Sequence, residues 1–363
     1  MAKRFIIAGG GTGGHIFPAI AIANALKKAD PLCHILFVGA MGKMEMEKVP
    51  QAGYEIRGLD IAGFNRSSLL KNIGLPFKLI KSFLQVRSII NAFKPHAVIG
   101  VGGYSSFPVL RYAQAKDIPT FIHESNSFAG KSNILLGKKA TKVFVASEGM
   151  DRFFPKERLM ITGNPVRPAI AKASSISKAD ALEYFNLEAG KKTVLVVGGS
   201  LGARSMNEAI YAHLPAIQQA DLQLIWQTGK TDTDKWKQRA EGHANIWVDA
   251  FITEMEFAYA AADMVVSRAG AIAVAELCVV QKPVLFVPFP FAAEDHQTAN
   301  AKALVDRDAA LMVKDSEAKD KMVDLLIALA NDEKRQEILR KNIAKYAVLD
   351  ADQQVADEIL KSL

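Results

Sequence analysis

The chain has 363 residues, of which 50% are hydrophobic and 23% are charged. These values exclude a disordered protein, and the length exceeds what one hydrophobic core usually serves, so two domains are expected. The net charge of +7 allows nucleic acid, an anionic membrane or a phosphorylated substrate as partner, without choosing among them. Cys33 and Cys278 offer neither disulfide nor zinc spacing, which fits a reducing compartment.

The first half alternates short apolar strands with helices. Strands are expected at 4–8, 35–38, 55–58, 97–100, 120–124 and 142–146, and helices include 18–28 and 75–91. This alternation is typical of a parallel sheet that helices cover on both faces. Glycines interrupt the apolar start of the chain, unlike a signal peptide, and no run of about eighteen apolar residues occurs.

Two prolines in the segment 163–168 indicate a connection between domains. Beyond it the strand pattern restarts at 193–197, 222–227, 245–248, 264–267, 283–287 and 310–313, and the stretch 332–363 is helical and charged. The sequence therefore predicts two doubly wound α/β domains, with a cleft between them that could hold a phosphorylated ligand.

A strand that leads into a run of glycines occurs twice, at 5–15 and at 194–204. Each copy predicts a helix N-terminus whose backbone N–H groups and dipole suit phosphate. A third glycine turn, at 100–106, supplies further donors or is only a strained junction. The first loop matches G-x-G-x-x-G, but the second strand ends at 37–41 without the carboxylate that binds ribose, which disfavours a nicotinamide enzyme.

Two polar groups in the first half are candidates for chemistry. His15 lies in the first turn of a predicted helix and titrates nearest neutrality, so it is a candidate general base or a local hydrogen-bonding residue. The run 123–126 follows a strand end, where polar residues usually face a ligand. The alternative is a buried hydrogen bond between His123 and Glu124 that holds the domain together.

The second half offers groups that suit a nucleotide sugar. Glu276 follows a turn of small residues and suits paired ribose hydroxyls, whereas Gln297 and Asn300 share a helix face and suit sugar hydroxyls. The alternatives are a surface carboxylate and a solvated helix start. No metal-ligand spacing is found in the sequence, so Arg167 and Arg268 are candidates to hold a leaving diphosphate.

Six motifs occur in order: Gly10-Gly11-Thr12-Gly13-Gly14-His15, Gly100-Val101-Gly102-Gly103-Tyr104, Gly163-Asn164-Pro165-Val166-Arg167, Gly198-Gly199-Ser200-Leu201-Gly202-Ala203, Ser267-Arg268-Ala269-Gly270-Ala271 and Glu294-Asp295-His296-Gln297. With them the chain resembles, over its whole length, the MurG family of peripheral-membrane glycosyltransferases of peptidoglycan synthesis. The resemblance implies the GT-B fold. It implies an acceptor- and membrane-binding domain at 1–164 and a UDP-sugar domain at 165–344, with a last helix at about 345–363 packing back on the first.

The resemblance implies an inverting transfer of N-acetylglucosamine (GlcNAc) from UDP-GlcNAc to the 4-hydroxyl of N-acetylmuramic acid (MurNAc). The acceptor would be undecaprenyl-diphospho-MurNAc-pentapeptide, so that lipid I becomes lipid II, and no cofactor would be required. The protein would lie peripherally on the cytoplasmic face of the inner membrane, with other cell-wall and division proteins as further partners and no nucleic acid. The alternatives are a UDP-GlcNAc 2-epimerase and a non-catalytic nucleotide-sugar-binding protein.

The resemblance also implies roles for individual residues. Those facing the acceptor diphosphate would be Gly11, Gly102, Gly103 and Tyr104. Those holding the donor diphosphate would be Ser200, Gly270, Ala271, Ile272, Ala273, Val274 and Ala275. Glu276 would bind the ribose, backbone at Ile252 the uracil and Gln297 the sugar, and the donor contacts would be completed by Thr12, Gly13, Gly14, Asn126 and Arg167. Ser125 stands where the family usually has Gln, and we assign it no role.

The segment 69–83 mixes apolar residues with lysines and contains no acid. Such a basic amphipathic segment can lie on an anionic leaflet, although an ordinary packed helix would have a similar pattern. The residues expected to meet the membrane are Lys71, Ile73, Phe77, Lys78, Ile80 and Lys81.

Overall fold

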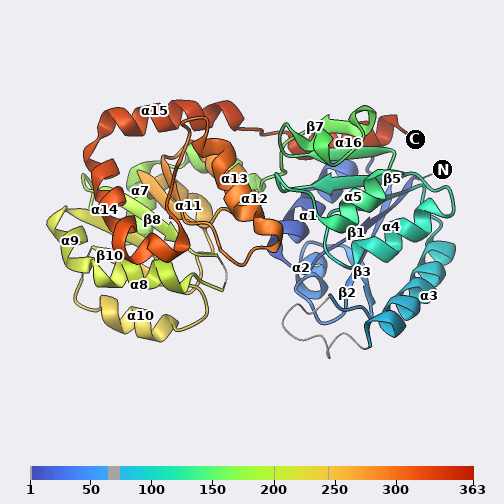
Figure 1. The fold of residues 1–363 in the computed structure, drawn as a ribbon, viewed down its shortest axis with the longest axis horizontal. Helices are drawn as coiled ribbons and strands as arrows, with labels where there is room; N and C mark the ends of the chain where they lie inside the picture. The colour runs from blue at the N-terminus through green and yellow to red at the C-terminus, as the bar shows by residue number, and fades with distance from the viewer. Residues whose placement is uncertain (1, 64–73, 200, 244) are drawn as a thin grey trace. The chain divides into compact units, whose positions relative to one another are not determined.

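The structure, a computed structural model, describes residues 2–63, 74–199, 201–243 and 245–363 (Figure 1). The chain divides into two compact units. Unit 1 comprises residues 1–166 together with 350–363, and unit 2 comprises residues 167–349. The division falls inside the proline-containing segment 163–168. The last helix belongs to unit 1, whereas residues 345–349, expected with it, belong to unit 2.

Unit 1 is built on a parallel sheet with the strand order β3-β2-β1-β4-β5-β6-β7. Its strands are β1 Arg4–Ala8, β2 His34–Ala40, β3 Glu55–Leu59, β4 Ala97–Gly100, β5 Thr120–Glu124, β6 Lys142–Val145 and β7 Leu159–Ile161. Its helices are α1 Gly13–Ala29, α2 Glu45–Gln51, α3 Leu75–Phe93, α4 Ser106–Gln114, α5 Lys131–Gly137 and α16 Ala351–Lys361, with short 3₁₀ turns η2 Met150–Arg152 and η3 Lys156–Arg158.

Strand β1 shows why the sheet of unit 1 is covered on both faces. Phe5 and Ile7 point into a core that α1 and α16 complete, whereas Ile6 and Ala8 point into the opposite core, to which α3, α4 and α5 contribute. Successive side chains of a strand alternate between faces, so a strand buried on both reads as a continuous apolar run.

The C-terminal helix α16 is part of unit 1. Val355 and Ile359 are fully buried in the same core as α1. Lys3 Nζ donates to the carbonyl of Leu360 at 3.3 Å, and Lys142 pairs with Glu358 at 3.6 Å. The chain therefore returns to unit 1 after unit 2 is complete.

Unit 2 has a parallel sheet with the order β10-β9-β8-β11-β12-β13. Its strands are β8 Lys192–Val197, β9 Leu222–Gln227, β10 Ile246–Asp249, β11 Met264–Ser267, β12 Val284–Phe286 and β13 Leu311–Met312. Its helices are α6 Pro168–Ala171, α7 Lys178–Tyr184, α8 Arg204–Ala212, α9 Leu214–Gln219, α10 Thr233–Ala240, α11 Met255–Ala261, α12 Ala271–Val280, α13 His296–Val305, α14 Ala318–Asn331 and α15 Glu333–Ile343. The 3₁₀ turns are η4 Ala173–Ser175, η5 Ala293–Asp295, η6 Asp315–Glu317 and η7 Ala344–Tyr346.

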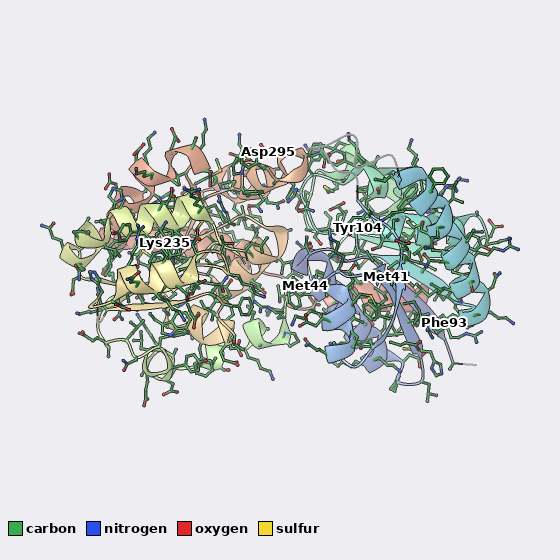
Figure 2. All side chains as sticks on the ribbon, turned by 90° about the horizontal axis from the view of Figure 1, so that it is seen from below. Met41, Met44, Phe93, Tyr104, Lys235 and Asp295 are labelled. Carbon is green, nitrogen blue, oxygen red and sulfur yellow. The ribbon has the colours of Figure 1, made fainter. Side chains whose placement is uncertain are left out.

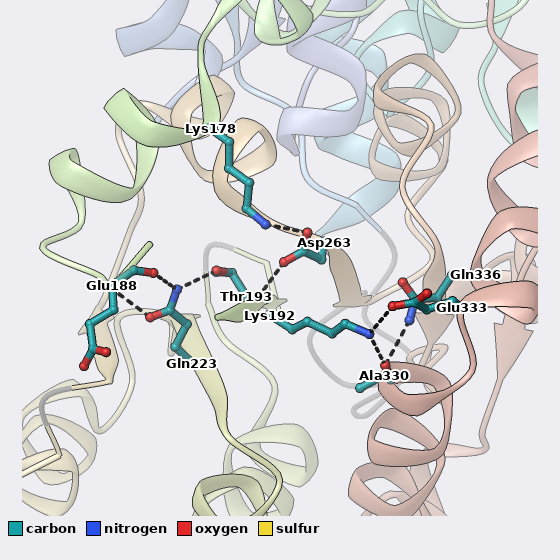
Figure 3. Close-up of polar contacts among 9 residues, drawn as sticks. All are labelled: Lys178, Glu188, Lys192, Thr193, Gln223, Asp263, Ala330, Glu333 and Gln336. Atoms are coloured by element: carbon teal, nitrogen blue, oxygen red, sulfur yellow. Dashed lines mark hydrogen bonds and ion pairs between the residues drawn. The ribbon is translucent and has the colours of Figure 1, made fainter. Parts of the chain in front are cut away.

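A polar network ties unit 2 together where β8 begins (Figure 3). Asp263 accepts from Lys178 Nζ at 2.6 Å and from the Thr193 backbone at 2.8 Å. Gln223 bridges the carbonyl of Glu188 and the hydroxyl of Thr193, at 2.8 and 2.9 Å. These groups are hydrogen-bonded to one another at the amino end of β8. The loops that follow the strands lie at the opposite, carboxyl edge of the sheet.

In both sheets the strand order reverses beside the first strand, between β1 and β4 and between β8 and β11. Ligands of open α/β sheets bind at the carboxyl ends of the strands at this point. The loops after these strands are therefore the places to examine. In the described part of the chain, no helix combines the length and apolar character that a membrane span requires.

Three expectations differ from the structure. The short strand β7 was not predicted. Helix α1 begins at Gly13 and contains Pro18, which we expected to start it. The stretch 332–363 is interrupted between α15 and α16 by η7 and the residues up to Asp350.

Candidate active site

In unit 1 the glycine loops after β1 and β4 contact each other. Gly10 N donates to the Gly102 carbonyl at 3.4 Å. A Cβ at Gly103, where φ is +83°, would lie 2.5 Å from the Gly10 carbonyl oxygen. Only glycine permits this approach, so the two predicted loops form one backbone-lined surface.

Glu45, at the start of α2, occupies this surface and was missed by the sequence analysis. It is 1% exposed, and its Oε2 accepts from Gly11 N at 2.8 Å, while its Oε1 accepts from Ala40 N at 2.9 Å. A Cβ at Gly10 would lie 2.3 Å from the Glu45 carboxyl carbon. The Gly11 N–H thus donates to the protein's own carboxylate, and its predicted contact with the acceptor diphosphate stays a prediction.

His15 lies in the first turn of α1 and contacts the same loop. Its Nδ1 is 3.1 Å from the Gly10 carbonyl oxygen and 3.4 Å from the Thr12 hydroxyl. A carbonyl only accepts hydrogen bonds, so we assign the Nδ1 proton to that bond, which makes Nε2 the accepting nitrogen of the neutral ring. A Cβ at Gly102 would lie 2.8 Å from Nε2, so the ring also depends on the second glycine loop. This tautomer is the one that a general base needs.

His123, in β5, is fully buried, and its Nδ1 lies 3.3 Å from the Ser125 hydroxyl. The pKa of His123 is lowered to about 4, chiefly by burial; a backbone hydrogen bond with Gly163 opposes this shift, and the charge of His15 adds to it. His123 is thus neutral at pH 7. Ser125, to which no role was assigned, is its hydrogen-bonding partner.

Glu124 clamps the loop that follows β5. Its carboxylate accepts from Asn126 N and Nδ2 at 3.1 and 3.2 Å, from Gly130 N at 3.0 Å and from Asn133 Nδ2 at 2.8 Å. The expected alternative of a His123–Glu124 hydrogen bond is therefore replaced by separate partners for the two side chains. Asn126, predicted to contact the donor, is oriented by this carboxylate.

The remaining predicted residues of unit 1 lie around the same loops. Thr12 is the N-cap residue of α1 and is exposed, and Gly13 and Gly14 begin the helix. Tyr104, labelled in Figure 2, is half-buried, and its ring would lie 3.0 Å from a Cβ at Gly63. Burial and the nearby Glu45 charge raise the pKa of Tyr104.

In unit 2 the start of α12 is formed as predicted. Gly270 is its N-cap residue, with φ −64° and ψ 142°, and the residues that follow in the first turns are half-exposed: Ala271, Ile272, Ala273, Val274 and Ala275. The first turn contains no acid. The N-terminus of a helix presents N–H groups and a positive dipole end, so this position suits a diphosphate.

Glu276 is a buried carboxylate rather than a surface residue, being 5% exposed. Arg167 donates to it through Nε at 2.8 Å and Nη2 at 3.2 Å. Tyr259, from α11, donates its hydroxyl to Oε2 at 3.3 Å. Sequence reasoning missed Tyr259, because an aromatic residue in an apolar helix reads as core. Burial and the Glu276 charge raise the pKa of Tyr259 well above its usual range, so its hydroxyl stays protonated.

Gln297 and Asn300 share a face of α13, as the spacing predicted, and both reach the loop before α12. Gln297 Oε1 accepts from Ala269 N at 3.2 Å and from Phe289 N at 3.0 Å. Asn300 Nδ2 donates to the Ala269 carbonyl at 3.1 Å. Because the Gln297 oxygen accepts from these two backbone groups, the predicted contact with the sugar would fall to the amide nitrogen.

Ile252 is connected to the glycine loop after β8. Its N–H donates to Gln227 Oε1 at 3.0 Å, and Gln227 Nε2 donates to the Gly199 carbonyl at 3.2 Å. The predicted backbone contact of Ile252 with uracil would therefore fall to its carbonyl. Ser200, predicted to hold the diphosphate, lies outside the described residues.

Arg268, a candidate to hold the leaving diphosphate, has its guanidinium in contact with groups of the protein itself, and that role stays a prediction. It pairs with Asp315 at 2.5 Å and donates to the carbonyls of Val287 and Pro288 at 2.9 and 3.2 Å. The side chain thus holds the strand ends of β11 and β12 together.

The predicted membrane segment is described from residue 74 on, so Lys71 and Ile73 lie outside the described residues. On α3, Phe77 is 76% exposed, and Ile80 and Leu84 are exposed as well. Lys78 and Lys81 both pair with Asp60, at 3.8 and 2.7 Å. The segment itself contains no acid, but the fold brings one to it.

The described residues contain no group of three or more His, Cys, Asp or Glu side chains that could hold a metal ion.

Comparison with known proteins adds two matches that cover most of the chain. Residues 5–145 match the glycosyltransferase family 28 N-terminal domain, and residues 193–355 match its C-terminal domain. The chain belongs to glycosyltransferase family 28.

Relatives within family 28 span nearly the whole chain. A protein of Phocaeicola vulgatus is 50% identical over 99% of this chain and 96% of its own length, and one of Flavobacterium psychrophilum is 48% identical over 99% and 97%. Both bear the name UDP-N-acetylglucosamine–N-acetylmuramyl-(pentapeptide) pyrophosphoryl-undecaprenol N-acetylglucosamine transferase.

Solved structures agree with the fold. The crystal structure of MurG from Acinetobacter baumannii is 30% identical, with a TM-score of 0.78 over 99% of both chains. A structure of MnaA with UDP from S. aureus has a TM-score of 0.71 at 16% identity, over 99% of this chain and 98% of the other. The family 28 chain therefore has the GT-B fold expected from its sequence. The second likeness concerns the fold alone.

Proposed function

We propose that this protein transfers GlcNAc from UDP-GlcNAc to the 4-hydroxyl of MurNAc in undecaprenyl-diphospho-MurNAc-pentapeptide, with inversion at the anomeric carbon. The observation that carries the proposal is the 50% identity, over 99% of the chain, to the Phocaeicola vulgatus protein, whose name gives UDP-N-acetylglucosamine, N-acetylmuramyl-(pentapeptide) pyrophosphoryl-undecaprenol and N-acetylglucosamine transfer. The product is the lipid-linked disaccharide that serves peptidoglycan synthesis.

Unit 2 supplies groups for the donor. The start of α12 would bind the diphosphate, Glu276 would accept from the ribose hydroxyls and the Gln297 amide would donate to the sugar. As the acceptor oxygen bonds to C1 of GlcNAc, the C1–O bond to UDP breaks, and the helix dipole stabilises the charge on the leaving diphosphate. No cofactor is proposed, and we expect EDTA to leave turnover unchanged.

Unit 1 would supply the base and the acceptor site. His15 Nε2 would take the proton of the 4-hydroxyl, a step that typically contributes 10²–10⁴-fold to the rate. Gly102, Gly103 and Tyr104 would face the acceptor diphosphate. The donor contacts assigned to Thr12, Gly13, Gly14 and Asn126 stay predictions.

The acceptor carries a lipid, so we propose that the protein acts peripherally at the cytoplasmic face of the inner membrane. The exposed apolar side chains of α3 and the neighbouring lysines support this location, because such a surface suits an anionic leaflet. Other cell-wall and division proteins are proposed as further partners.

The test is incubation with labelled UDP-GlcNAc and a lipid I analogue, followed by mass spectrometry of the lipid product. The proposal expects a GlcNAc-MurNAc disaccharide and released UDP. Conversion to UDP-ManNAc without acceptor would indicate a 2-epimerase, and UDP binding without either product would indicate a non-catalytic protein.

In the same assay, His15→Ala should lower kcat by about 10² or more and flatten the acidic limb of the pH profile. A raised acceptor KM with the limb in place would instead make His15 a diphosphate contact.

A further inference from the structure

We propose that Glu45 is a positioning residue for His15, acting through the single peptide group between Gly10 and Gly11. Glu45 Oε2 accepts from the N–H of that peptide at 2.8 Å. The carbonyl of the same peptide lies 3.1 Å from His15 Nδ1. This inference rests on the proposed role of His15 as general base.

The geometry places the carboxylate and the imidazole at opposite ends of one peptide dipole. In a planar trans peptide the C=O and N–H bonds point in opposite directions, so one group can accept a proton donor while the other faces an acceptor. Hydrogen bonds in such a chain polarise one another. A negative charge on the N–H side therefore strengthens the bond that the carbonyl accepts from Nδ1–H.

Three further observations fix the carboxylate in this role. Glu45 is 1% exposed, and its other oxygen is held by Ala40 N at 2.9 Å. A Cβ at Gly10 or at Gly39 would meet the Glu45 side chain within 2.5 Å. The neighbouring Glu47 of the same helix is exposed and pairs with Lys48, whereas Glu45 is buried against the loop.

The consequence for the reaction is specific. The acceptor hydroxyl would lose its proton to Nε2 as its oxygen bonds to C1 and the C1–O bond to UDP breaks, leaving a positive imidazolium. Glu45 takes no proton. It holds the Nδ1 tautomer and stabilises the imidazolium through the peptide, which makes Nε2 more basic.

Of the described titratable groups, His123 on β5 interacts electrostatically with His15, Glu45 on α2 is linked to it through the Gly10–Gly11 peptide, and Tyr104 after β4 lies near Glu45. His123 is buried and neutral at pH 7, and burial raises the pKa of Tyr104, so it too stays uncharged. Replacing the Glu45 carboxylate, which is linked to His15 through the Gly10–Gly11 peptide, should therefore move the acidic limb of the pH profile towards lower pH.

The test compares the wild type with Glu45→Gln, Glu45→Asp and the control Glu47→Gln, each also in a His15→Ala background. Glu45→Gln should lower kcat by roughly 10-fold or more, with unchanged affinity for UDP, and shift the acidic limb of kcat to lower pH. Glu45→Asp, which keeps the charge, should recover part of the rate, and Glu47→Gln should match the wild type. In the His15→Ala background, Glu45→Gln should have no further effect.

Two outcomes would overturn the inference while leaving the proposed base standing. One is a loss of kcat in Glu45→Gln with the acidic limb in place. The other is an equal further loss in the His15→Ala background, which would indicate a structural role; circular dichroism of each variant reports on folding directly. If His15→Ala alone keeps the wild-type rate and pH profile, the proposed base itself is wrong and the role of Glu45 falls with it.

Discussion

Glu276 is a buried carboxylate for which the fold supplies partners and which we predict to bind the ribose. Arg167 and Tyr259 supply three donated hydrogen bonds to it. An ionised carboxylate has about four acceptor positions, so this arrangement leaves room for a ribose hydroxyl. Arg167 also neutralises the charge, which makes burial of Glu276 tolerable.

We expect Glu276→Ala to weaken UDP binding by about 1–3 kcal/mol, because a bound ribose hydroxyl would be left without its acceptor. Calorimetric titration with UDP measures this, and Glu337→Ala, which removes an exposed carboxylate of α15, is the matched control. Titration with 2′,3′-dideoxy-UDP should show little difference between Glu276→Ala and the wild type. Equal losses for both nucleotides would mean that Glu276 does not read the ribose.

His123 predicts a pH dependence of stability. Its folded pKa of about 4 lies below the ordinary value of 6.5, so between these values the unfolded chain binds the additional proton. The contribution of the neutral His123 to the free energy of unfolding is therefore fully present above about pH 6.5. It is lost as the pH falls towards 4, by about 3 kcal/mol in all. Urea unfolding at pH 7.5 and pH 5 should show this loss in the wild type and a smaller one in His123→Gln. The exposed His34→Gln should behave like the wild type, and an unchanged pH dependence in His123→Gln would contradict the assignment.

At the residue scale, the sequence indicates candidate site residues better than it indicates the residues that they contact. Gln297 and Asn300 lie on one helix face as their spacing predicted, whereas Glu276 was singled out because it follows a turn of small residues. Glu45 and Tyr259 were missed, since their contacts are with residues 34 and 17 positions away in the chain. No local pattern separates Glu45 from the exposed Glu47 two positions later.

Among the elements, the bounds of several buried strands were predictable from the sequence, whereas a short strand and the start of a helix were not. Parallel strands covered on both faces are apolar runs, so β1, β4, β5, β9 and β11 have the expected bounds. Strand β7 has three residues, too few to show periodicity, and follows a charged 3₁₀ turn. Pro18 suggested a helix start because proline suits the first turn, yet α1 begins five residues earlier, at the glycine loop.

Helix α3 is part of the predicted membrane-binding segment, and its contacts with Asp60 allow that prediction to be tested. The Lys81 hydrogen bond and charge lower the pKa of Asp60, so this carboxylate is ionised and offsets the lysines at neutral pH. Asp60→Asn should therefore strengthen binding to anionic vesicles by roughly 5-fold, whereas replacing Lys78 and Lys81 by Gln should weaken it. Co-sedimentation at low and high salt measures both changes.

The control for Asp60 is Asp324→Asn, which changes the net charge equally at an exposed position of α14 in unit 2. It should leave vesicle binding unchanged. If the two variants bind alike, or if the wild type binds neutral and anionic vesicles equally, α3 is not the membrane surface.

At the scale of the whole molecule, unit 2 is inserted into unit 1. Residues 167–349 are continuous, whereas unit 1 needs both 1–166 and 350–363. The core that α1 shares with α16 includes Val355, Ala356 and Ile359, which are fully buried. The first unit therefore cannot complete its core until the last residues of the chain are present.

We expect the fragment 167–349 to unfold cooperatively on its own, because its two cores are made only of its own residues. The fragment 1–166 should be less stable than the same fragment joined through a glycine–serine linker to 350–363. Burying one Val or Ile side chain contributes about 1.5–3 kcal/mol, so the loss of Val355 and Ile359 should cost at least about 3 kcal/mol. Urea unfolding followed by circular dichroism measures the difference, and the linked fragment carrying Val355→Asp and Ile359→Asp should behave like 1–166 alone. Equal midpoints for 1–166 with and without 350–363 would mean that α16 is an attached helix and not a part of the core that holds β1 and the glycine loop in place.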